Sequence, residues 1–188
     1  MGLETLVLLV LAVVPSAVIP SPITSPSSLA VDQCLYGLGD KATYVEGCFD
    51  PCECPIMART GLEGSFLLTP AGTDGQFVNY ELSQLSWLVM WQGEVFHRVE
   101  GTGVFRLDES GKRQQLLLNL SFDGDAPLAF DSGVVPLDAE FPQLDVTVSM
   151  NGMYCYDRVF HLIAAPNGKI GVASESAWGA LKARYLEH

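Results

Sequence analysis

Positive charge is scarce in this sequence. Its 188 residues include 10 Lys and Arg against 22 Asp and Glu, which gives a formal net charge of −12. Ten scattered cations cannot offset the repulsion between a phosphate backbone and so acidic a protein, so no nucleic-acid partner is expected. The sequence also lacks a glycine-rich phosphate loop and a dinucleotide-binding fingerprint, which argues against nucleotide chemistry.

Motifs that would fix a reaction are absent as well. The sequence has no G-x-S-x-G nucleophile elbow and no C-x-x-C redox pair. Histidine is limited to His97, His161 and the terminal His188. Charged residues make up only 17% of the chain and hydrophobic residues 48%, which excludes intrinsic disorder and predicts one domain with its own core.

The apolar run near the N-terminus is short. It covers the nine residues 6–14, too few to cross a bilayer but typical of the central region of a signal peptide. Ser28 and Ala30 suit a cleavage site, whereas Glu4 and the lack of a basic start do not fit the pattern. Residues 1–30 are therefore predicted to be an export signal, and an apolar N-terminal arm that docks on another chain is the alternative. Export would make the protein secreted, periplasmic or attached to the cell surface.

The C-terminal residues 167–188 carry the clearest helical pattern. Trp178, Leu181 and Tyr185 recur at the spacing of one helix face, which predicts a short C-terminal helix. The chain ends in Leu-Glu-His, as an appended polyhistidine tag begins, so His188 enters no functional argument.

Residues 31–166 are predicted to form the folded domain. Runs of β-branched, aromatic and alternating apolar residues are separated by turns rich in Gly, Asp, Asn and Pro. The triplet at 101–103 predicts a bulge, and Asn151-Gly152 predicts a two-residue hairpin turn. This spacing predicts an all-β protein, an antiparallel β-sandwich or small β-barrel of seven to eight strands with the short C-terminal helix. The principal expected strands are 64–69, 77–91, 94–107, 114–122, 144–150 and 153–164.

Four of the five cysteines lie in one turn-rich segment. Cys34, Cys48, Cys52 and Cys54 precede the expected strands, and Cys155 lies far along the chain. The C-x3-C-x-C group has thiolates for zinc, but structural zinc sites usually use paired C-x2-C knuckles, so disulfides are favoured in an exported chain. We expect Cys34 to pair with Cys48, and Cys52 or Cys54 to pair with Cys155.

A metal or acid–base site is conceivable at three residues. On regular strands, His97 would share a face with Val95 and Val99, and Asp157 would share one with His161. If those faces converge, His97, Asp157 and His161 form a two-His, one-carboxylate set suited to one divalent metal ion or to proton transfer. No short motif supports this set, so the favoured interpretation is that each histidine has its own partner on a half-buried strand.

Two further groups of residues are candidates for binding. Trp87 and Trp91 are expected on one face of the same strand, where exposure would make a stacking platform for glycans and burial would make them core residues. Both faces of that strand are apolar, which favours the core interpretation. Loop carboxylates offer oxygen ligands for calcium, without the spacing of a known calcium loop: Asp108, Glu109, Asp123, Asp125, Asp138 and Glu140.

The sequences GCFDPCECP at 47–55 and GMYCYD at 152–157 resemble those of a group of uncharacterised secreted bacterial β-rich proteins with an N-terminal cysteine cluster. The resemblance covers Cys34 to Pro166. It implies export and a β-rich domain, and no activity comes with it.

Together these features predict an exported, non-catalytic binding or structural module of the cell surface or extracellular space. We expect no cofactor, a glycan or cell-surface partner, and self-association into a homo-oligomer through the N-terminal arm or an open strand edge. The alternative is a small secreted metal-dependent hydrolase or oxidase centred on His97, Asp157 and His161.

Overall fold

The computed structural model describes residues 33–55 and 57–169. Within these ranges the protein is all-β and antiparallel, as predicted, and has no helix. Among the described residues there is accordingly no helix long and apolar enough to cross a membrane. The described strands are β1 (Cys34–Leu38), β2 (Thr43–Cys48), β3 (Met57–Thr73), β4 (Phe77–Trp91), β5 (Glu94–Asp108), β6 (Arg113–Phe122), β7 (Leu128–Asp131), β8 (Val135–Pro136), β9 (Leu144–Ser149) and β10 (Tyr156–Lys169).

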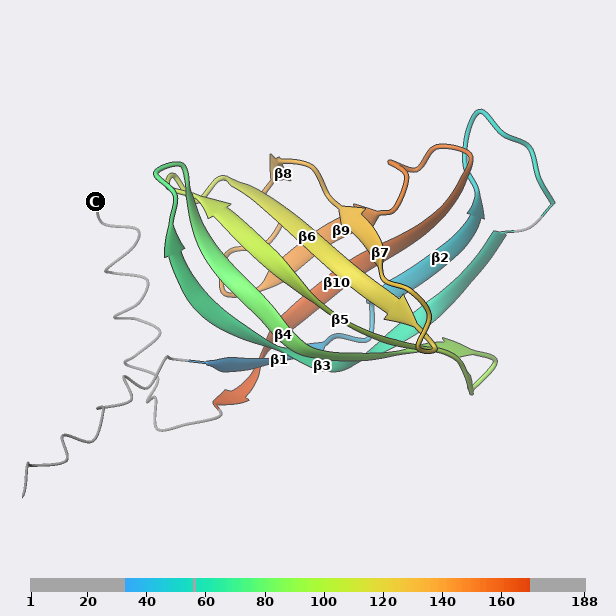
Figure 1. Ribbon diagram of the computed structural model, residues 1–188, viewed down its shortest axis with the longest axis horizontal. Helices are drawn as coiled ribbons and strands as arrows, with labels where there is room; N and C mark the ends of the chain where they lie inside the picture. The colour runs from blue at the N-terminus through green and yellow to red at the C-terminus, as the bar shows by residue number, and fades with distance from the viewer. Residues whose placement is uncertain (1–32, 56, 170–188) are drawn as a thin grey trace, which may run out of the picture.

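All ten described strands belong to one strongly curved sheet, shown in Figure 1. Its order is β1-β10-β2-β3-β4-β5-β6-β7-β9, and β8 pairs with β6. β9, the last strand in this order, also pairs with β10, the second strand. β7 and β9 share only the pair Asp131–Ser149. The expected number of seven to eight strands was too low, because β1 and β2 form within the segment expected to be irregular.

Aromatic side chains fill the concave side of the sheet. Phe160 is central, with ring centroids of Tyr44, Phe130 and Trp87 at 4.9, 5.3 and 5.5 Å. All four side chains are buried, and each burial of this kind contributes about 1.5–3 kcal/mol. Successive side chains of a strand point to opposite faces, so one face of each strand packs into this core and the other faces outward.

The predicted irregularity at Gly101–Gly103 is present, and the extra residue lies in the neighbouring strand. Leu82 pairs with Gly103 and Leu85 pairs with Gly101, so β4 has one residue more than β5 at this point. A Cβ atom on Gly101 would lie 2.1 Å from the carbonyl oxygen of Asn119. Glycine is therefore required by the close approach of β6.

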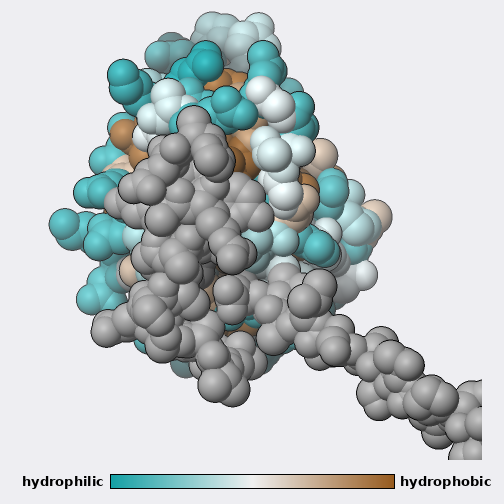
Figure 2. All heavy atoms as spheres, turned by 90° about the vertical axis from the view of Figure 1, so that its left-hand side faces the viewer, coloured by the Kyte–Doolittle hydropathy of each residue, from teal (hydrophilic) through white to brown (hydrophobic). Residues whose placement is uncertain are grey.

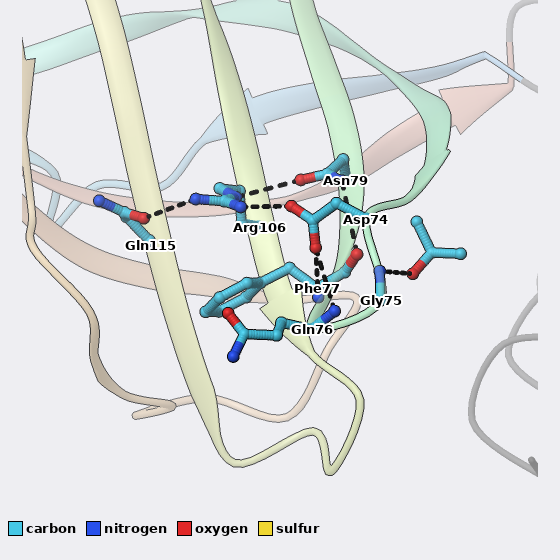
Figure 3. A network of polar contacts seen from close by, with 8 residues as sticks. Asp74, Gly75, Gln76, Phe77, Asn79, Arg106 and Gln115 are labelled. Carbon is cyan, nitrogen blue, oxygen red and sulfur yellow. Dashed lines mark hydrogen bonds and ion pairs between the residues drawn. The ribbon is translucent and has the colours of Figure 1, made fainter.

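A polar network ties the turn between β3 and β4 to the sheet at the end of the molecule away from the cysteine loops (Figure 3). Arg106 donates to Asn79 and Gln115, forms an ion pair with Asp74, and lies over the ring of Phe77. Asp74 accepts hydrogen bonds from the backbone N–H groups of Phe77 and Gln76, which with Arg106 lower its pKa to about 2. Figure 2 views the molecule from this end, with hydrophilic side chains around its periphery.

The ends of the chain fall largely outside this description. The predicted export signal or arm at 1–30 and the predicted helix face at Trp178, Leu181 and Tyr185 lie outside the described residues. Residues 167–169, expected in the C-terminal segment, continue β10.

Candidate functional site

The three predicted metal ligands do not form one group. His97 Nδ1 lies 2.6 Å from a carboxylate oxygen of Asp123, and His161 Nε2 lies 2.8 Å from one of Asp145. His161 alternates with the core residues Phe160 and Leu162 and so faces outward, whereas His97 contacts the core ring of Phe122. In the part of the chain that the structure describes, no three His, Cys, Asp or Glu residues gather as a metal site.

Asp157 is fully buried and organises a loop. Its carboxylate accepts backbone hydrogen bonds from Met150, Asn151, Met153 and Arg158, at 2.6–3.0 Å. These bonds hold a loop, residues 150–155, between β9 and β10. The prediction of a two-residue turn at Asn151-Gly152 is wrong, because this loop is longer. The carboxylate supplies acceptors that a tight hairpin ladder would otherwise provide.

The cysteines pair differently from the expectation in one respect. Cys52 is joined to Cys155, as one of the two alternatives predicted, but Cys48 is joined to Cys54. The expected Cys34–Cys48 bond is wrong, because Cys34 lies in the core at the start of β1 and takes part in neither disulfide. Both bonds hold the loop between β2 and β3, and one fastens it to the loop between β9 and β10.

The two tryptophans have separate roles. Trp87 is 0% exposed and belongs to the core, as favoured, whereas Trp91 at the end of β4 is 42% exposed. The extra residue at the register shift between Val89 and Met90 lies in β5, so Trp91 keeps the core-facing side of β4 and is exposed at the last residue of that strand. A stacking platform made of both tryptophans is excluded, and Trp91 alone remains available on the surface.

Two of the loop carboxylates proposed for calcium already accept hydrogen bonds from protein donors. Asp108 accepts hydrogen bonds from Ser110, Lys112 and Arg113. Burial alone would raise its pKa, but these hydrogen bonds prevail and lower it to about 2. The pKa of Asp123 is lowered by the backbone N–H of Arg98 and by His97.

A groove on the convex, outer face is the strongest candidate site. Its first hollow, of about 710 Å3, lies along β6, β7 and β9 and includes Leu117, Asn119, Asp131 and Ser149 in its walls. The second, of about 240 Å3, crosses β9, β10, β2 and β3. It is lined by Thr43, Val45, Phe49, Arg59, Thr147, Met153, Val159 and His161.

The hollows adjoin one another, since neighbouring hollows share lining residues. Thr147 and Met153 line both the first and the second, and Arg59 lines the second and a third of about 380 Å3 beside Trp91. The groove therefore crosses β6, β7, β9, β10, β2, β3 and the end of β4. Seven neighbouring strands at about 4.8 Å spacing give it a length of roughly 29 Å along the curved surface.

The disulfide-linked loops form one wall of this groove. Phe49, from the loop after β2, and Met153, from the loop before β10, both line the second hollow. The backbone N–H of Phe49 donates to the carbonyl of Cys155 at 2.9 Å, and the Cys52–Cys155 bond joins the same loops. Figure 1 shows these loops side by side at one end of the molecule.

An ion pair on the core side supports the same two strands from below. The Glu46 carboxylate on β2 accepts from Arg158 and Tyr156 on β10 and from Tyr44, the last at 2.7 Å. Burial opposes ionisation of Glu46, yet these partners lower its pKa. Arg158 also lies over the ring of Phe122, 4.6 Å from its centroid. The floor of the groove at β2 and β10 is therefore rigidly braced.

Comparison with known proteins found no relative. No protein-family model, no curated protein and no solved structure matches this protein. The resemblance to secreted bacterial proteins with a cysteine cluster stays a prediction.

Sequence reasoning missed the groove residues. Thr43, Arg59 and Thr147 carry no motif, and they become neighbours only through the pairing of β2 with β10 and of β10 with β9. The signal in the sequence was the alternation of side chains along each strand. It predicts that these residues face outward but does not identify their neighbours on other strands.

Proposed function

We propose that this protein is an exported, non-catalytic binding module that holds an extended glycan along the outer-face groove. The observation that carries the proposal is the row of three adjoining hollows, which share Thr147, Met153 and Arg59 in their walls. A long groove fits a polymer better than a compact metabolite, which pockets usually enclose. The sheet, whose pairings return on themselves, serves as its barrel-like scaffold.

The direction of the groove favours a glycan over a peptide. Extended peptides usually bind by adding a strand along a sheet edge, parallel to the existing strands. This groove crosses the strands, so a ligand in it meets side chains rather than a free row of backbone groups. The hydroxyl and amide groups of Ser149, Thr147 and Asn119 suit sugar hydroxyls.

Trp91 supplies a stacking surface at the rim of the third hollow, from the core-facing side of β4 where that strand ends. Its side chain is 42% exposed and lines the third hollow beside Arg59. The ring of Phe96 lies nearby, with 6.4 Å between centroids, and is also exposed. An exposed aromatic ring beside polar groups offers an apolar face for a sugar ring and hydrogen bonds at its edge.

The disulfides support the exported location. Bonds of this kind persist in oxidising compartments and are rare in the cytosol. Both bonds constrain loops that border the groove, so an oxidising compartment would also preserve the wall of the binding site.

The test is a screen of the purified protein against an array of plant, bacterial and animal polysaccharides, followed by calorimetry on those retained. Thr147→Trp places a large side chain where the first and second hollows meet, and we expect it to abolish binding. Ser86→Trp, at an exposed position of β4 away from the hollows, is the matched control and should bind normally. Retention of no polysaccharide, or equal binding by both variants, would overturn the proposal.

A further inference from the structure

We infer that the second hollow, around Arg59, His161 and Thr43, binds the carboxylate of an acidic sugar, so that the ligand class is a carboxylated polysaccharide. This inference rests on the proposed function, because it assigns chemistry to the middle of the same groove. It adds that the ligand carries a negative charge and that Arg59 binds this charge.

Strand register brings these side chains together. On the outer face, His161 of β10 lies directly opposite Thr43 of β2 and Thr147 of β9. One step along, Arg59 of β3 lies opposite Val45 of β2, which places it diagonally from Thr43. Opposed residues on neighbouring strands have Cβ atoms about 5 Å apart and diagonal neighbours about 7–8 Å, within reach of an arginine side chain.

The space beside Arg59 is open on the side of the third hollow. Gly61 pairs with Thr43 in the same row, and a Cβ atom built on it would meet no heavy atom within 4 Å. Arg59 is exposed, and within the described residues its guanidinium has neither an ion pair nor a hydrogen bond. The cation is thus available to a ligand that enters from either hollow.

Two further polar groups have capacity left for a ligand. The hydroxyl oxygen of Thr43 is buried and has no hydrogen-bond partner in the described part of the chain. A buried hydroxyl without a partner costs about 1–3 kcal/mol, which a ligand oxygen would recover. His161 donates from Nε2 to Asp145, so in the neutral imidazole Nδ1 is an acceptor, which suits a hydroxyl of the sugar that carries the acid group.

A carboxylate fits the Arg59 guanidinium best, with the Thr43 hydroxyl as a second donor. The planar guanidinium of arginine matches a carboxylate with two parallel hydrogen bonds, and such charge-assisted bonds are the strong ones. The net charge of −12 opposes a polyanion at long range, but at physiological salt the screening length is about 8 Å, so the groups lining the hollow decide the binding.

The neighbouring surface limits where the acid group can sit. Asp131 lines the first hollow, where a second carboxylate would be repelled. Asp145 beside the second hollow is engaged by His161, and Trp91 lines the third hollow, which suits the face of a sugar ring. The acid group is therefore placed at the centre of the groove, with neutral sugar units on both sides.

The experiment compares polygalacturonate with the same polymer after full methyl esterification, by calorimetry in 0.15 M salt, a concentration at which long-range repulsion is screened. We expect the acid form to bind more tightly than the ester. Arg59→Gln, which removes the charge and keeps hydrogen-bonding capacity, should weaken binding of the acid form about tenfold and leave the ester unchanged. Arg98→Gln, at an exposed arginine of β5 outside the three hollows, is the control of equal charge change.

The outcomes separate the two proposals. Equal affinity for acid and ester, or equal effects of Arg59→Gln and Arg98→Gln, overturns the carboxylate site and leaves the groove as a site for neutral glycan. Failure of every polysaccharide on the array to bind overturns the proposed function, and the carboxylate site with it. Circular dichroism and thermal unfolding of both variants exclude misfolding as the cause.

Discussion

Cys52 and Cys155 lie 103 positions apart in the sequence, and their Cα atoms are 4.8 Å apart in the structure. Their bond fastens the loop after β2 to the loop before β10, and these loops carry Phe49 and Met153 into the wall of the groove. One covalent bond therefore connects the stability of the fold with the shape of the candidate site.

Removing the Cys52–Cys155 bond should affect both the stability of the fold and the shape of the groove wall. In the chain-entropy account, loss of a cross-link that closes about 100 residues costs about 5 kcal/mol, whereas one that closes about six costs about 2 kcal/mol. We expect Cys52→Ser with Cys155→Ser to lower the free energy of unfolding much more than Cys48→Ser with Cys54→Ser. Urea unfolding of the two double variants measures the difference. Equal losses would show that the long bond does not constrain the unfolded chain as described.

The two tryptophans should separate binding from stability. Trp91→Ala should leave the free energy of unfolding within about 0.5 kcal/mol of the parent, because the side chain is exposed. It should also weaken glycan binding measured by calorimetry, by about 1 kcal/mol for the lost stacking. Trp87→Phe is the informative partner, since it disturbs the core and leaves the groove untouched. A binding loss confined to Trp87→Phe would contradict the placement of the site.

Asp157 should act as a structural residue and not as a metal ligand. Asp157→Asn replaces one acceptor oxygen with an amide donor, in a buried site that supplies backbone donors. We expect a loss of about 2–3 kcal/mol in urea unfolding, and no change after addition or chelation of zinc or manganese. Asp138→Asn, at an exposed loop position, serves as the control. Recovery of Asp157-dependent stability on adding a metal ion would contradict this role.

Asp108 should make stability depend on acid pH. Its pKa is about 2 in the folded protein against an ordinary value of 3.8, so its contribution is fully present above about pH 4. That contribution, of about 2 kcal/mol, is lost as the pH falls towards 2. Asp108→Asn should therefore destabilise the protein at pH 6 and differ little from the parent near pH 2. A pH-independent difference in urea midpoint would show that Asp108 acts through packing alone.

Much of the secondary structure followed from local pattern. The runs expected at 77–91, 94–107 and 114–122 correspond closely to β4, β5 and β6, because turn residues and alternating apolar residues specify them locally. The prediction of a two-residue hairpin turn at Asn151-Gly152 failed because residues outside the turn determine this loop. The buried carboxylate of Asp157 and the bond at Cys155 favour a longer loop over the tight turn.

The sequence by itself determined that the chain is an antiparallel β protein with an apolar core and an acidic surface, since alternation and composition act at short range. Tertiary structure alone decided that Cys48 pairs with Cys54, that His97 and His161 lie on opposite sides of the sheet, and that Arg59, His161 and Thr43 are neighbours. The last two depend on register between strands distant in sequence, whereas the first follows once Cys34 is placed in the core and Cys52 is joined to Cys155. A shift of one residue there turns every side chain of a strand to the other face.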